Sequence, residues 1–106
     1  MKHYWLDAHG EPIAEEDVIA WARRLETADR TVVRTEIPPD VVVSTVFLGL
    51  DHQFGFGPPL LFETMVFGGP LGGEQARYST RDEAVAGHVG MLARVRGAVC
   101  LLPAVQ

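Results

Sequence analysis

Four polar residues are the candidates for chemistry in this sequence. Asp51 and His52 are adjacent, directly after an apolar β-branched run and at the start of a glycine-rich loop. A carboxylate and an imidazole in that position could bind a metal ion or transfer protons. Glu63 lies in the next apolar run, and His88 belongs to a helical pattern. If the four side chains converge, they form a metal-dependent or acid/base site.

Structural roles are the alternative for the same four residues. Their spacing matches no metal signature such as HExxH or paired CxxC. Asp51 and His52 would then bond the loop backbone, while Glu63 would pair with an arginine or face solvent. His88 would be a half-buried helix residue. Because the sequence also lacks a GxSxG elbow and a GxxxxGK phosphate loop, we expect no catalytic residue, no metal ligand and no cofactor.

Aromatic residues mark the loop over residues 51–59, which contains Phe54, Gly55, Phe56 and Gly57. This loop is longer than a tight hairpin connection of about two to five residues. Aromatic anchors dominate the energetics of many protein interfaces. We therefore expect these four residues to contact a protein partner. In the alternative, both phenylalanines fold back over the core.

The elements that position these residues follow from the apolar periodicity. Apolar residues at three- and four-residue steps indicate two helices, and the second begins with a capping box formed by Thr80 and Glu83. Gly97 is expected to end this helix. The expected elements are a small hairpin over residues 4–13, helices over 15–29 and 80–96, and strands over 31–37, 41–50, 60–67 and 74–78.

This order of elements separates the helices from a run of strands, which is typical of the α+β class. We expect a single α+β domain over residues 1–106. It would contain a mostly antiparallel sheet of about four to five strands, with two helices packed on one face.

Composition narrows the possible partners and the compartment. The chain has 106 residues, 47% of them hydrophobic, and a formal net charge of −5. A nucleic-acid-binding protein usually needs a basic stripe, so direct nucleic-acid binding is not expected. The single cysteine, Cys100, fits a reducing compartment. No apolar run is long enough for a membrane span, so we expect a cytoplasmic protein.

Residues 44–88 read STVFLGLDHQFGFGPPLLFETMVFGGPLGGEQARYSTRDEAVAGH. This stretch resembles a family of small proteins encoded in actinobacteriophage genomes and in actinobacterial chromosomes. The N-terminal YWLDAHGEPI, followed by a tryptophan-bearing helix, also fits, so the resemblance covers most of the chain. The resemblance implies a phage or prophage context, and it carries no catalytic residue over to this chain.

Three functions are compatible with these observations. The first is a small phage-type accessory protein that binds a host or phage protein without catalysis, in the host cytoplasm if it is phage-encoded. The second is an enzyme that uses Asp51, His52, Glu63 and His88. The third is a self-associating structural module, a homodimer formed through an uncovered sheet face or a free edge strand. The acidic charge, the small size and the aromatic loop favour the first function.

Overall fold

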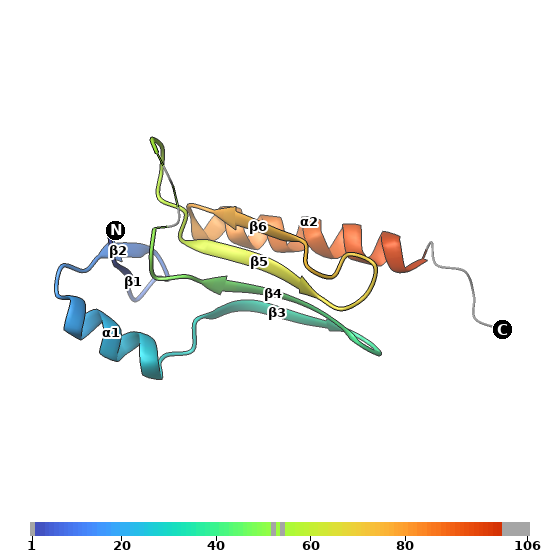
Figure 1. Cartoon of the computed structure of the whole chain (residues 1–106), viewed down its shortest axis with the longest axis horizontal. Coiled ribbons are helices and arrows are strands. Elements are labelled where there is room, and N and C mark those ends of the chain that lie inside the picture. The colour runs from blue at the N-terminus through green and yellow to red at the C-terminus, as the bar shows by residue number, and fades with distance from the viewer. Residues whose placement is uncertain (1, 52, 54, 101–106) are drawn as a thin grey trace.

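A four-stranded antiparallel sheet with one long helix across its face forms the centre of the molecule (Figure 1). The computed structural model describes residues 2–51, 53 and 55–100. In chain order the elements are β1 (Tyr4–Leu6), β2 (Pro12–Ala14), α1 (Val18–Thr27), β3 (Thr31–Ile37), β4 (Val41–Phe47), β5 (Phe62–Phe67), β6 (Gln75–Tyr78) and α2 (Arg81–Cys100). The large sheet has the order β3-β4-β5-β6, and β1 pairs with β2. The expected α+β class and antiparallel sheet are confirmed.

The core lies between α2 and one face of the large sheet. Buried and partly exposed residues alternate along β4 and β5, as expected when one face of a strand is covered. Two clusters fill the core. One consists of Phe47, Leu61, Phe62 and Ala84, and the other of Val41, Val43, Val66, Met91 and Val95.

Helix α2 begins with the capping box that the sequence indicates. The Glu83 N–H donates to Thr80 Oγ1 at 3.1 Å, and the Thr80 N–H donates to Glu83 Oε1 at 3.1 Å. The expected end at Gly97 is wrong, because the helix continues to Cys100. Val99 packs against the same cluster as Val95. Its burial favours a further turn despite the cost of about 1 kcal/mol for glycine inside a helix.

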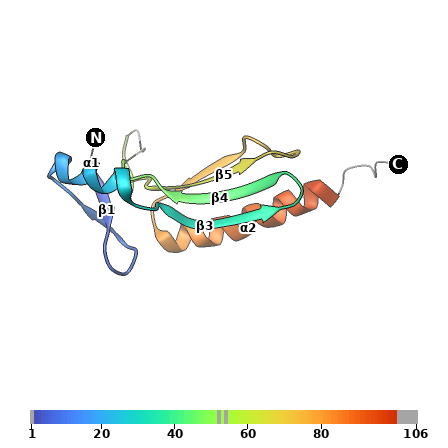
Figure 2. The same ribbon diagram turned by 90° about the horizontal axis from the view of Figure 1, so that it is seen from below.

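Helix α1 is shorter than the expected range of residues 15–29, and it does not lie on the expected face of the large sheet. Asp17 caps it by accepting from the N–H groups of Ile19 and Ala20, so the helix begins after the acidic residues. Both views place α1 beyond the end of the large sheet, beside β1 and β2 (Figures 1 and 2). The expectation that both helices cover one face therefore holds for α2 and not for α1.

A tryptophan explains the position of α1. Trp21 is its buried residue, and its indole N–H donates to the Tyr4 carbonyl at 2.9 Å. The His3 ring meets the Trp21 ring edge-on at 4.5 Å. On β1, the Trp5 ring lies 6.0 Å from that of Phe47, which joins the hairpin to the end of the core. Helix α1 thus packs on the hairpin, and the hairpin packs on the sheet.

Candidate functional site

The loop that connects β4 to β5 is held together at its base by Asp51. Asp51 Oδ1 accepts hydrogen bonds from the backbone N–H of Gln53 at 2.8 Å and of Leu60 at 3.0 Å. One carboxylate oxygen therefore ties the start of the loop to its end. The interpretation that Asp51 bonds the loop backbone is confirmed. We call residues 51–60 the 51–60 loop.

Backbone hydrogen bonds from the N-terminal segment hold the base of the 51–60 loop in position. The Tyr4 N–H donates to the Gly49 carbonyl at 2.8 Å, and the Asp51 N–H donates to the Lys2 carbonyl at 3.3 Å. His3 and Leu50 form an isolated antiparallel bridge between these two bonds. The 51–60 loop is thus attached to both β4 and the N-terminal strand.

The tip of the loop presents an aromatic side chain to solvent. Phe56 is fully exposed, and it lies between Gly55 and Gly57. These glycines have φ of +114° and +127°, which a residue with a Cβ rarely adopts. In Figure 1 the described tip of the loop, residues 55–59, stands out from the end of the sheet. For Phe56, the alternative of folding back over the core is wrong. Phe54 and His52, also named as candidates, lie outside the described residues.

Glu63 lies on the face of the sheet that α2 leaves uncovered. Its Oε2 accepts from Arg77 Nε at 2.9 Å, and the two residues are cross-strand neighbours on β5 and β6. The expectation that Glu63 pairs with an arginine is confirmed. The next residue, Thr64, faces α2, because successive side chains of a strand point to opposite faces.

His88 is buried in the core, with 2% of its surface exposed, and is not half-buried as expected. Its Nδ1 lies 2.7 Å from Thr45 Oγ1, and its Nε2 lies 2.9 Å from Thr35 Oγ1. Thr45 Oγ1 in turn bonds Thr64 Oγ1 at 2.5 Å. Both ring nitrogens therefore have a hydroxyl partner. Because its hydrogen-bonding groups are paired, the imidazole can be buried in an apolar core. Burial lowers the pKa of His88 and favours the neutral ring.

The described candidates for chemistry do not form one cluster. His88 bonds residues on the α2 side of the sheet, whereas Glu63 points to the other side. Asp51 bonds the loop backbone. Among the described residues, no group of three or more His, Cys, Asp or Glu side chains could hold a metal ion. What the arrangement offers chemically is a buried hydrogen-bond network and an exposed aromatic loop.

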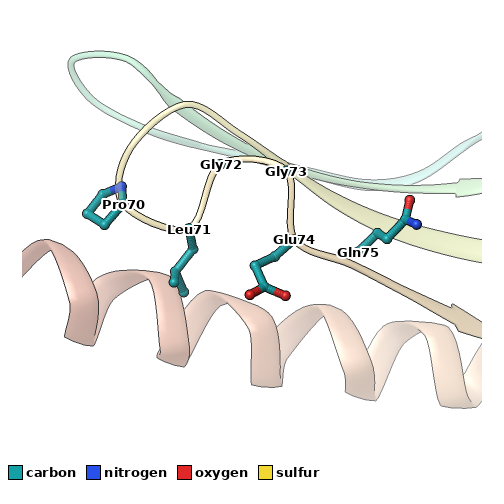
Figure 3. Close-up of a pocket in the computed structure, with 6 residues that line it drawn as sticks. All are labelled: Pro70, Leu71, Gly72, Gly73, Glu74 and Gln75. Carbon is teal, nitrogen blue, oxygen red and sulfur yellow. The ribbon is translucent and has the colours of Figure 1, made fainter.

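The hollow beside the turn between β5 and β6 has no converging polar side chains. It measures about 430 Å³ and is lined by Pro70, Leu71, Gly72, Gly73, Glu74 and Gln75. Figure 3 shows the side chains of Leu71 and Glu74 directed toward α2. Leu71 packs against the core cluster that includes Met91 and Val95 of α2. Glu74 Oε1 lies 3.8 Å from Arg94 Nη2. These residues attach the turn to the helix.

Comparison with protein-family models, with curated proteins and with solved structures returned no match. Neither helix in the described part of the chain combines the length and the apolar character that crossing a membrane requires.

The threonine network that His88 joins is what sequence reasoning missed: Thr35 and Thr45 bond the imidazole, and Thr64 bonds Thr45. Thr35, Thr45 and Thr64 come from three different strands, and each occupies a core-facing position between apolar residues. His88 follows Ala84 by four residues on the buried side of α2. One sequence pattern could have predicted this buried network. It is a threonine on the buried side of each of three neighbouring strands, together with a histidine on the apolar stripe of a helix.

Proposed function

We propose that this protein is a non-catalytic protein-binding module that contacts its partner through the tip of the 51–60 loop. The observation that carries this proposal is the full exposure of Phe56 on a loop whose base is held by Asp51. Asp51, Glu63 and His88 each bond a different part of the structure, so these three residues do not make up the shared site that the alternative acid/base enzyme requires.

The energetics of Phe56 favour a binding role. Transferring a phenylalanine side chain from water into an apolar pocket contributes about 1.5–3 kcal/mol. The two hydrogen bonds to Asp51 close the loop before any partner binds. A base that is closed in advance reduces the conformational entropy lost on binding, so more of the burial energy appears as affinity.

The expected partner is a protein with an apolar pocket for Phe56 and positive charge around it. The chain has a formal net charge of −5, and complementary charge speeds association and disfavours wrong partners. The resemblance of residues 44–88 to small phage and prophage proteins favours a host or phage protein as this partner. The host cytoplasm would then be the place of action.

Affinity capture with matched variants tests the proposal. The immobilised wild type, Phe56→Ala and Phe67→Ala are exposed to an actinobacterial lysate, and the retained proteins are quantified by mass spectrometry. Phe67 is a suitable control because it is also a phenylalanine and is 51% exposed, but lies on β5. A specific partner should be retained by wild type and Phe67→Ala and lost with Phe56→Ala. Equal retention by all three proteins contradicts the proposal.

A further inference from the structure

The large sheet has two outer strands, β3 and β6, and they differ in length. β3 contains seven residues and β6 contains four. An outer strand presents N–H and C=O groups that no neighbouring strand uses. Figure 1 shows α1 beyond the end of β3 and not alongside it, so no described element lies along the outer edge of β3.

The side chains of β3 divide between the two faces of the sheet. Val33, Thr35 and Ile37 share the face that α2 covers, since their partners on β4 are buried there. Arg34 and Glu36 lie on the opposite face, where they form an exposed ion pair. On each side of Thr35 the strand has a charged residue followed by an apolar residue. These are Arg34 and then Val33 on one side, and Glu36 and then Ile37 on the other, so the two charges are opposite in sign.

Among the residues of β3 itself, Thr31–Ile37, opposite charges meet in one antiparallel register. If a twofold axis perpendicular to the sheet passes beside Thr35, Arg34 lies opposite Glu36 of the partner subunit. Val33 then lies opposite Ile37 of the partner subunit. A register centred on Arg34 places two arginines opposite each other, and one centred on Glu36 places two glutamates opposite each other. Opposite charges across a strand pair stabilise it, and like charges destabilise it.

We propose that two copies of this chain form a dimer by antiparallel pairing of their β3 strands, centred on Thr35. The two four-stranded sheets become one continuous sheet, with both copies of α2 on the same face. The Arg34 and Glu36 side chains of each copy gain a partner from the other copy. Val33 and Ile37, which are half-buried in one copy, become covered from the side.

The other outer strand does not offer the same complementarity. A pairing of β6 centred on Ala76 would place Arg77 opposite Gln75, and no opposite charges would meet. Arg77 is also engaged by Glu63 of the neighbouring strand. The charge pattern therefore selects β3. The proposed dimer uses residues outside the 51–60 loop and does not depend on the proposed function.

Charge reversal with measurement of molar mass tests the dimer. Wild type should sediment as a dimer in the micromolar range. In Glu36→Arg, two arginines of one copy face two arginines of the other, and in Arg34→Glu four glutamates meet. Each variant alone should dimerise at least about tenfold more weakly. The equimolar mixture of the two variants should dimerise like wild type, because every arginine then faces a glutamate.

The mixture separates pairing between copies from the ion pair within one strand. Each variant carries like charges within its own β3, in the mixture as well as alone, so only pairing between copies can restore the dimer. Glu26→Arg, an exposed reversal on α1, is the matched control and should dimerise like wild type. Circular dichroism verifies that each variant is folded. A monomeric wild type overturns the proposal and means that the two charges protect the edge from pairing. A dimer that all variants retain also overturns it.

Discussion

Gly87 of α2 lies directly against the side chain of Tyr78, and its replacement by alanine should destabilise the protein. A Cβ at Gly87 would lie 2.3 Å from the ring of Tyr78, on β6. No real Cβ contact is that short, so the ring or the helix would have to move. The Tyr78 ring packs against the cluster that includes Phe47 and Phe62, which limits its freedom to move.

Gly90 is the matched control, because it lies on the same helix and a Cβ there meets nothing within 4 Å. Replacing a helical glycine by alanine gains about 1 kcal/mol from backbone propensity at either position. Overpacking at Gly87 should cost about 1–3 kcal/mol. The propensity gain cancels in the comparison, so the two variants should differ by about 1–3 kcal/mol, with Gly90→Ala the more stable.

Urea unfolding monitored by circular dichroism measures this difference. In thermal unfolding of the same variants, each kcal/mol corresponds to a shift of roughly 4–8 °C in Tm for a domain near this size. Tyr78→Leu provides a further check, because a smaller side chain should reduce the cost of Gly87→Ala in the double variant. If Gly87→Ala proves as stable as Gly90→Ala, the close packing of α2 on Tyr78 is refuted.

Three further predictions concern His88, Asp51 and Thr80. Burial lowers the pKa of His88, so as the pH falls the imidazole is protonated in the unfolded chain before it is protonated in the folded protein. The stability that comes from the neutral ring is therefore complete above the unfolded pKa and is lost as the pH falls through the folded pKa. Unfolding free energies measured from neutral to mildly acidic pH should therefore fall by up to about 1.4 kcal/mol per pH unit, and this dependence should disappear in His88→Gln. Asp51→Ala removes the bonds that close the 51–60 loop, so limited proteolysis within the loop should become faster while the core unfolds with little change in midpoint. Thr80→Ala should cost about 1 kcal/mol in urea unfolding by removing the cap of α2, whereas Thr80→Ser, which retains the hydroxyl, should cost less.

Local patterns predicted most of the elements, because they act over a few residues. β3 has the bounds that its alternation and the following prolines indicate. The capping box of Thr80 and Glu83 forms as its spacing predicts. The position of α1 was not predictable in this way, since it depends on the contact of Trp21 with Tyr4, seventeen residues earlier in the chain.

The candidate site shows the same division between local and long-range information. The loop-bonding role of Asp51 was anticipated because its main partners are close in sequence. The burial of His88 was not anticipated, because its nearest hydroxyl belongs to Thr45, which lies 43 residues away in the sequence. Only the register of the sheet and the docking of α2 bring these groups together. The residue pattern within a single helix or strand does not predict contacts between elements that are distant in the sequence.

The proposal that the protein binds a partner through Phe56 is tested most directly by a dissociation constant. The partner retained by the wild type is purified, and its binding to wild type, Phe56→Ala and Phe67→Ala is measured by titration calorimetry. Phe56→Ala should weaken binding at least about tenfold, equivalent to about 1.4 kcal/mol, while Phe67→Ala should bind like wild type. Equal affinity of wild type and Phe56→Ala would contradict a binding role for the 51–60 loop.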